Sequence, residues 1–230
     1  MKKILYSILM GGALLFTATS CENEVEDNSV VTYYVDLQLK GEKQMWVEVN
    51  TPFEDPGFTA TENGEDVASK VEVEGEVESD KIGYYVLNYS AVNKDGFSIS
   101  DSREVFVYDP SVQDDYSGTY TAEGKRTTPN GTDTFSDFSV EISLMNQGFY
   151  SFSDFLGGYY ESGKGYGEVA ALKGYASIGT DKKVTGLYSF VQAWGDSATS
   201  ITGTVESDGT IKMVVVYGGM TFEYKLTKAN

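Results

Sequence analysis

The chain has 230 residues, of which 17 are Lys or Arg and 35 are Asp or Glu, so its formal charge is −18. A charge this negative argues against nucleic acid or anionic lipid as a partner, because phosphate binding needs clustered basic side chains. The lack of histidine excludes Ser-His-Asp catalysis and His-ligated metal sites, and the single cysteine excludes an intrachain disulfide.

The first twenty residues have the composition of an export signal. Lys2 and Lys3 precede an apolar run at residues 4–16, which is too short to span about 30 Å of hydrocarbon as a helix. Small residues follow, and then comes the only cysteine, Cys21. This arrangement resembles the lipobox of bacterial lipoproteins, although Ala18 stands where that family usually has Leu. The resemblance implies that residues 1–20 are removed and that Cys21 carries a lipid; the alternative is an ordinary secretory signal.

Residues 21–32 form an acidic tether after the cysteine. Its acidic start, residues 22–27, resembles the export signal with which Bacteroidetes lipoproteins reach the outer face of the outer membrane. The resemblance implies a lipid-anchored outer-membrane protein that faces the cell exterior. The alternative is a solvated spacer with no signalling role.

From Tyr33 onward, short alternating apolar runs separated by Gly, Asn and Asp predict an all-β protein. Two runs in the first part predict strands with one buried face: Val35, Leu37 and Leu39, and Val71 and Val73. Pro110 ends the last such run, and a polar segment follows it. We therefore expect two domains, at residues 33–110 and 111–230.

Three motifs follow one another along the first domain. They are F-x-D-P-G-x-x-A at residues 53–60, G-x-Y-x-x-x-Y-x-A at residues 83–91 and R-x-V-x-V at residues 103–107. Between the last two, residues 93–96 predict a hairpin turn in which Gly96 accepts a positive φ. The set resembles a bacterial immunoglobulin-like family first noted in an insecticidal crystal toxin. It implies an immunoglobulin-like sandwich that acts as a spacer or docking surface. Trp46 lies inside this domain, and we expect it in the core.

The second domain shows roughly eight strand-like runs. Clear alternation occurs at Val140, Ile142 and Leu144 and again at Phe222, Tyr224 and Leu226, and residues 207–210 predict a hairpin turn. Such an antiparallel meander suits a barrel or a small sandwich, lipocalin-like in outline.

The order of anchor, immunoglobulin-like domain and β domain resembles the accessory lipoproteins of SusC/SusD-type nutrient importers in gut Bacteroidetes. The resemblance implies SusC/SusD-like importer subunits as partners and a peptide or glycan as ligand. We therefore predict a non-enzymatic, ligand-binding or accessory component of nutrient uptake. Two alternatives remain open: a purely structural subunit of a surface assembly and, less favoured, a glycoside hydrolase.

The most unusual stretch lies at residues 154–167. Five glycines and three tyrosines fall within residues 157–167, and the tyrosines are Tyr159, Tyr160 and Tyr166. Gly lets a backbone approach a ligand and Tyr supplies a large ring with a polar tip, so we predict a mobile binding loop. A phosphate-binding P-loop is rejected, because Gly165 stands where such a loop needs Ser or Thr. The alternative is a loop whose tyrosines fold back onto the domain.

Two further candidates lie close together before residue 200. Trp194 precedes a Gly turn and is predicted to be a stacking platform or partner anchor; the alternative is a core Trp that caps the barrel end. Ser197, in Asp-Ser-Ala, resembles the sites at which Bacteroidetes attach O-glycans to exported proteins; the alternative is a polar turn.

The acidic residues predict neither a metal site nor a catalytic pair. Asp114, Asp115 and the acidic residues at 133–137 lack the spacing of a calcium loop, so solvated turns are expected. Glycoside hydrolysis needs two carboxylates, but among 35 acids their mere presence discriminates nothing. We predict no catalytic residue and no cofactor.

Overall fold

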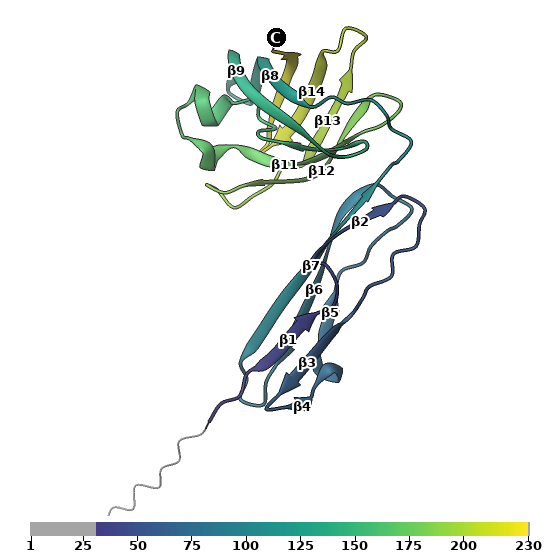
Figure 1. Cartoon of the computed structure of the whole chain (residues 1–230). Coiled ribbons are helices and arrows are strands. Elements are labelled where there is room, and N and C mark those ends of the chain that lie inside the picture. Colours follow the sequence, from purple (N-terminus) through teal and green to yellow (C-terminus); the bar gives the residue numbers. More distant parts are fainter. Residues whose placement is uncertain (1–30, 230) are drawn as a thin grey trace, which may run out of the picture. The chain divides into compact units, whose positions relative to one another are not determined.

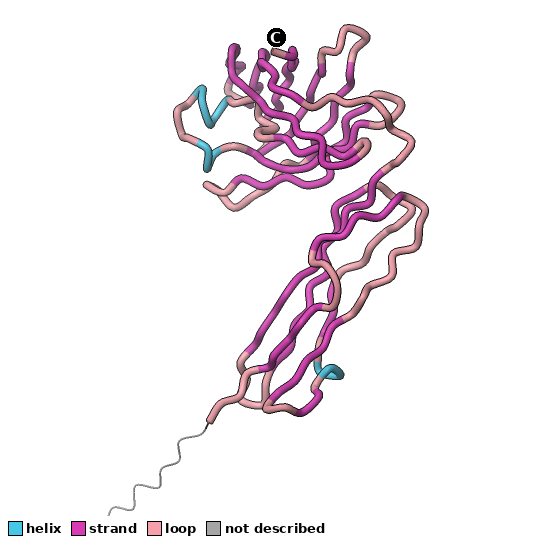
Figure 2. Tube along the Cα trace, viewed as in Figure 1, coloured by secondary structure: helices cyan, strands magenta, loops and turns pink. Residues whose placement is uncertain are grey.

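The computed structural model describes residues 31–229. Within this range the chain forms fifteen strands and three short helical turns, which stand out in cyan against the strands in Figure 2. The predicted all-β class is confirmed, with an immunoglobulin-like part followed by a closed antiparallel barrel. The predicted signal peptide, most of the tether and the lipid-attachment residue Cys21 lie outside the described residues.

Two sheets form the immunoglobulin-like part (Figure 1). One sheet has the order β1-β3-β4, with β1 at Val35–Leu39, β3 at Phe58–Glu62 and β4 at Glu65–Asp66. The other has the order β2-β7-β6-β5, with β2 at Gln44–Glu48, β5 at Glu72–Glu74, β6 at Gly83–Val92 and β7 at Ser98–Tyr108. A one-turn helix, η1, lies at Ala68–Lys70. Apolar side chains from the two sheets make the core: Val35, Leu37, Ala60, Leu87, Tyr89 and Ala91.

The motifs quoted for this part meet at one buried charge. The Arg103 side chain is fully buried and donates through Nη2 to the carbonyl oxygen of Lys40 at 2.7 Å. Its Nη1 lies 3.3 Å from Oδ1 of Asp55, and the Tyr89 hydroxyl donates to Oδ2 of Asp55 at 2.9 Å. A buried guanidinium needs such partners, because an uncompensated charge in the core costs several kcal/mol. Residues from all three motifs thus contact one another around this charge, and Asp55 compensates it.

The hairpin between β6 and β7 forms at the predicted turn. The side-chain oxygen of Asn93 accepts hydrogen bonds from the backbone N–H groups of Asp95 and Phe97, and Gly96 has a φ of 88°. Trp46 is only half-buried, and its ring stacks on that of Phe106 with 4.6 Å between centroids.

Two alternating runs do not bury the residues expected of them. Val73 is 46% exposed, and all three residues of β5 are exposed at the edge of the sheet, where β6 is their only neighbouring strand. Leu144 is also exposed, although it pairs with the buried Tyr150 as the last residue of β9 before the register shift against β10. These two expectations were wrong, while the burial of Val35 and Leu37 and of Phe222, Tyr224 and Leu226 is confirmed.

The second part is a closed barrel of eight antiparallel strands, from teal to yellow in Figure 1. Each strand pairs with the next in sequence, and the last closes on the first. The strands are β8 Gly118–Thr128, β9 Gly131–Asn146, β10 Phe149–Phe152, β11 Leu172–Ile178, β12 Lys183–Val191, β13 Ser200–Val205, β14 Ile211–Tyr217 and β15 Met220–Lys228. The predicted meander and its turn at residues 207–210 are confirmed.

Side chains fill the interior of this barrel. They include Tyr150, Phe152, Phe155, Leu156 and Phe222, all at most 2% exposed. Phe155 and Leu156 belong to the β10–β11 connection, which folds into one end of the barrel. Since the interior is packed, a ligand surface is expected on the loops or on the outer face.

Alternate hairpins of an antiparallel meander lie at the same end of the barrel. The connections β8–β9, β10–β11, β12–β13 and β14–β15 therefore share one end. This end holds all four ring residues singled out from the sequence: Tyr159, Tyr160, Tyr166 and Trp194.

Candidate functional site

A buried carboxylate holds the β10–β11 connection in place. Oδ1 of Asp154 accepts hydrogen bonds from the backbone N–H of Leu156 at 2.8 Å and of Leu172 at 2.9 Å. Oδ2 accepts another from Gly158 at 2.9 Å. One side chain thus ties the start of the connection to the first residue of β11. The sequence predicted a mobile loop here, and Asp154 had no role in that prediction.

The environment of Asp154 changes its acidity. Burial disfavours the charged carboxylate and raises the pKa of Asp154 to about 6, while the three backbone N–H groups act in the opposite direction. The nearby charge of Glu161 adds to the rise. The loop is therefore anchored by a group that titrates close to neutral pH.

A short π-helix, η2 at Tyr159–Gly163, contains the adjacent residues Tyr159 and Tyr160 and gives their side chains different environments. It begins after Gly158, which has a φ of 77°, and a Cβ there would lie 2.5 Å from the Cβ of Phe138, so only glycine fits. The ring of Tyr159 turns inward, is 3% exposed and packs against Phe222 with 5.7 Å between centroids. Its hydroxyl donates to Asp133 at 2.9 Å. Tyr159 is thus a core residue of the barrel end and supports the loop rather than forming its surface.

The other three rings come together, and we call Tyr160, Tyr166 and Trp194 the barrel-end cluster. Tyr160 and Trp194 meet edge to face with 5.2 Å between centroids, and Tyr166 lies parallel to Tyr160 at 6.1 Å. Tyr166 is 57% exposed and Trp194 is 44% exposed. Trp194 is therefore not the buried cap that was its alternative reading.

A backbone hydrogen bond joins the two loops that carry this cluster. The N–H of Ala193 donates to the carbonyl oxygen of Val169 at 2.8 Å, while the N–H of Gly195 closes the turn of its own loop by donating to that of Val191 at 2.9 Å. Val169 lies in a second short helical turn, η3 at Glu168–Ala170, and is 48% exposed. The exposed rings and Val169 consequently form one amphipathic surface on two connected loops.

Polar groups that the sequence analysis did not select surround the cluster. Arg126 donates to the Tyr160 hydroxyl at 3.2 Å and forms an ion pair of 2.6 Å with Asp133. The Tyr159 hydroxyl and the Arg126 charge lower the pKa of Asp133. On the other side, the Tyr217 hydroxyl donates to Asp196 at 2.7 Å. In the sequence, Arg126 is the only arginine among the acidic residues of segment 123–137, and this could have indicated its ion pair with Asp133.

The remaining candidates lie on exposed turns. Ser197 is exposed in the β12–β13 loop, and its modification stays a prediction. Asp114 and Asp115 accept hydrogen bonds from Tyr116 and Ser117. Among residues 31–229, no group of three or more His, Cys, Asp or Glu is placed to hold a metal ion. In the same part of the chain, no helix has the length and apolar character needed to cross a membrane.

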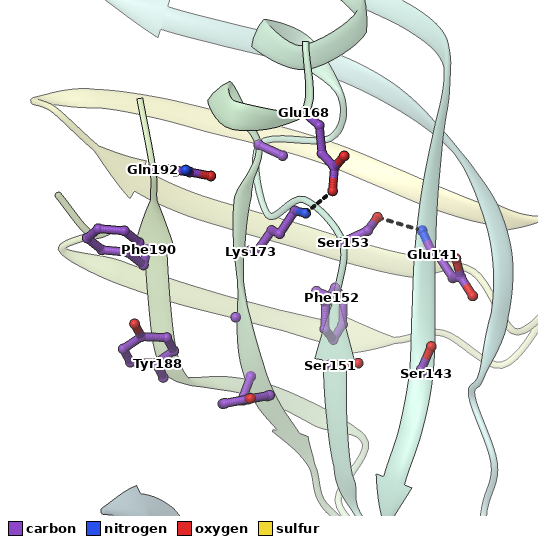
Figure 3. A pocket seen from close by; sticks show the side chains of 13 residues that line it. Glu141, Ser143, Ser151, Phe152, Ser153, Glu168, Lys173, Tyr188, Phe190 and Gln192 are labelled. Atoms are coloured by element: carbon purple, nitrogen blue, oxygen red, sulfur yellow. Dashed lines mark hydrogen bonds and ion pairs between the residues drawn. The ribbon is translucent and has the colours of Figure 1, made fainter. Parts of the chain in front are cut away.

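A groove on the outer side of the barrel is the second candidate surface (Figure 3). It lies over β9–β12 and has a volume of about 660 Å³, within the range typical of ligand sites. Its lining combines two exposed rings with hydroxyl, amide and charged groups, among them Glu141, Ser143, Ser151, Lys173, Tyr188, Phe190 and Gln192. The sequence analysis missed this groove entirely.

Comparison with known proteins places the chain among bacterial surface proteins. Residues 37–107 match the family of bacterial surface protein Ig-like domains, and residues 109–228 match a family of C-terminal domains. The crystal structure of the lipoprotein BT2262 from Bacteroides thetaiotaomicron is 36% identical in sequence. That match covers 85% of this chain and 100% of the other, with a TM-score of 0.48. The predicted kinship with Bacteroidetes surface lipoproteins is confirmed, while the SusC/SusD-type partner stays a prediction.

Two structures of domains from Clostridium perfringens ZmpB are more distant. One contains its catalytic domain with two CBM51 domains, at 18% identity over 52% of this chain and 14% of that chain. The other contains a CBM51 domain in complex with GlcNAc together with INT domains, at 16% identity over 86% of this chain and 44% of that chain. Both have a TM-score of 0.28. No curated protein matches the sequence significantly.

Proposed function

The chain belongs to the same family as the Bacteroides thetaiotaomicron lipoprotein BT2262, and from this premise we propose that it is a non-enzymatic surface protein that binds a nutrient for uptake across the outer membrane. The ligand is a peptide or a glycan. The lipid on Cys21 and the acidic tether hold the folded part at the membrane.

The exposure of the barrel-end cluster carries this proposal. Single exposed apolar side chains are normal, but Tyr166, Trp194 and Val169 together present a contiguous amphipathic surface. Such rings gain much contact area at low entropic cost when a partner covers them. The anchored loop fixes them before binding, which reduces the ordering cost of the complex.

Attachment to the membrane would keep a bound ligand close to an importer. A ligand held on a lipid-anchored domain meets an importer on the same membrane at a much higher effective concentration than it does from bulk solution. SusC/SusD-like importer subunits are the partners that we propose for this transfer. The immunoglobulin-like part then acts as spacer or docking element.

Fluorescence of Trp194 tests the proposal. The chain has two tryptophans, so the variant Trp46→Phe leaves Trp194, at the barrel end, as the only source of tryptophan fluorescence. We expect a saturable fluorescence change when the full chain is titrated with a tryptic peptide mixture or with an oligosaccharide mixture. The change should disappear when Tyr166→Ala is added.

The alternative of a purely structural subunit gives a different result. It predicts no saturable response to either mixture, together with a stoichiometric complex with importer subunits when the tagged full chain is purified from detergent-treated membranes. A saturable response to the mixtures that Tyr166→Ala leaves unchanged would move the binding site away from the barrel-end cluster.

A further inference from the structure

Strand β12 carries its aromatic rings on the outside of the barrel. Tyr188 and Phe190 are each 41% exposed, whereas Ser189 between them is buried and its Oγ accepts a hydrogen bond from Ala198 at 3.0 Å. Burial of the two rings instead of the serine would remove far more apolar surface from water. The inverted pattern therefore marks the outer face of β12 as a contact surface, of which the Tyr84 ring already occupies part, with 5.0 Å between its centroid and that of Tyr188.

The pairing register extends this surface across three more strands. Tyr188 pairs with Tyr175, Tyr175 pairs with Ser151, and Ser151 pairs with Ser143, so one row runs from β12 to β9. Neighbouring strands lie about 4.8 Å apart, which gives the row a length of about 14 Å. The row begins with aromatic rings and ends with hydroxyl groups.

A second row runs beside the first. Phe190 pairs with Lys173, and Ser153 and Glu141 are linked beyond it by a hydrogen bond from the Glu141 N–H to the Ser153 Oγ at 2.9 Å. Figure 3 shows Tyr188, Phe190 and Gln192 projecting from one strand, with the serines and Glu141 on the far side of the groove. The rings and the Gln192 amide on one side thus face hydroxyl and carboxylate groups on the other.

We propose that this groove binds a neutral glycan. The apolar C–H faces of sugar rings would stack on Tyr188 and Phe190, and their hydroxyl groups would exchange hydrogen bonds with side chains such as Ser151 and Gln192. The site is separate from the barrel-end cluster, so the inference goes beyond the proposed function.

The strand pairing in the groove floor argues against an extended peptide as ligand, and the charges of the lining argue against an anionic polymer. Strands β10 and β11 are paired on both sides, so their backbone offers an extended peptide no free edge to pair with. Lys173 is paired with Glu168, and Glu141 adds a further negative charge. An anionic polymer would therefore meet no free cation among these lining residues and would be repelled by the carboxylates.

Calorimetric titration of the full chain in detergent tests the inference. The probes are the uncharged hexasaccharides cellohexaose, maltohexaose, mannohexaose and xylohexaose, with hexagalacturonate as an anionic comparison. We expect saturable binding of at least one uncharged probe and none of hexagalacturonate. The double variant Tyr188→Ala/Phe190→Ala should weaken that binding at least tenfold, about 1.4 kcal/mol.

Two variants separate the groove from the rest of the barrel. Gln192→Ala should weaken the same binding several-fold without removing a ring, which covers the case in which the double variant folds poorly. Val214→Ala truncates a side chain that is 40% exposed on β14, outside both candidate surfaces, and should change the affinity less than twofold.

Three results would overturn the inference. They are no binding of any uncharged probe, unchanged affinity in the folded double variant, and loss of binding only in Tyr166→Ala/Trp194→Ala, which removes two rings from the barrel-end cluster. In the last case the proposed function stands and only the groove assignment fails. No heat of binding with any hexasaccharide, together with a saturable change of Trp194 fluorescence on addition of the peptide mixture, would likewise leave the proposed function standing and overturn only the groove assignment.

Discussion

The indole of Trp194 meets the ring of Tyr160 edge to face, with 5.2 Å between the ring centroids. The two residues lie on different loops, one after β10 and one after β12, so the contact joins these loops at the barrel end. The same indole lies 6.4 Å from the ring of Tyr166 and keeps 44% of its surface exposed. The contact therefore orders the rings without covering them.

Trp194→Ala should affect binding more than stability. A half-exposed ring has less area to lose, so we expect the free energy of unfolding to fall by about 1–2 kcal/mol, against about 3–5 kcal/mol for a fully buried aromatic. Ligand or partner affinity should fall roughly tenfold. Chemical denaturation and the fluorescence-independent calorimetric titration measure the two effects.

Phe222→Ala is the matched control, because this ring is fully buried in the same barrel. It should cost the larger amount, about 3–5 kcal/mol. If Trp194→Ala proves equally destabilising, Trp194 is a structural residue and leaves the proposed site.

Asp154→Ala should loosen the β10–β11 connection. The substitution leaves three buried backbone N–H groups without their acceptor, each at a cost of about 1–3 kcal/mol. Amide hydrogen exchange of Leu156, Gly158 and Leu172 should accelerate far more than that of the β14 core. Unchanged protection at these three amides would show that the loop is held by its apolar contacts alone.

Alternation along the chain was enough to predict most strands, because a half-buried strand repeats every two residues. It failed at Val73, which lies on a three-residue edge strand, and at Leu144, which is the last residue of β9 paired before the register shift. It also could not give the phase of β12, since Tyr188 and Phe190 alternate with Ser189 and Val191 in a pattern that allows either face to be buried.

The loop residues show a second limit. Tyr159 and Tyr160 are neighbours of the same type, and only the turn of η2 decides that one enters the core and the other reaches the surface. Asp154 looks like an ordinary loop acid in sequence, because its three acceptor contacts exist only after residues 154 and 172 come together. The barrel-end cluster was predictable by residue type, but its supporting carboxylate and its Arg126–Asp133 pair were not.

Asp55→Ala should destabilise the immunoglobulin-like part strongly. Arg103 is fully buried, and removal of the Asp55 carboxylate leaves its charge without compensation, at a cost of about 3–5 kcal/mol. Asp101→Ala is the control, because its partner Lys43 is 64% exposed and such surface pairs contribute at most about 1 kcal/mol. Urea denaturation compares the two variants, and equal effects would contradict the role given to Arg103.

Cys21→Ala should release the protein from the membrane. The residue is the only cysteine and follows the apolar leader, so its loss removes the predicted lipid attachment. Cell fractionation should then find the variant in the soluble fraction. A variant that still partitions into detergent with the membranes would exclude lipidation at this residue.

The protonation of Asp154 should make the free energy of unfolding depend on pH. Its folded pKa is about 6, above the value of about 3.9 for an unfolded Asp. The folded state therefore binds more protons than the unfolded state between these values, and the contribution of Asp154 to stability falls as the pH rises from about 4 to about 6. Two pKa units correspond to about 3 kcal/mol.

Asp154→Asn isolates this contribution, because the amide does not titrate and every other carboxyl is present in both proteins. Carboxyls with lowered pKa values, such as Asp115 and Asp133, change stability in the opposite direction but cancel in the comparison. The free energy of unfolding of the wild type minus that of the variant should decrease by about 2 kcal/mol between pH 4 and pH 7. A difference that is flat or increases over this range would mean that the three N–H groups outweigh burial at Asp154.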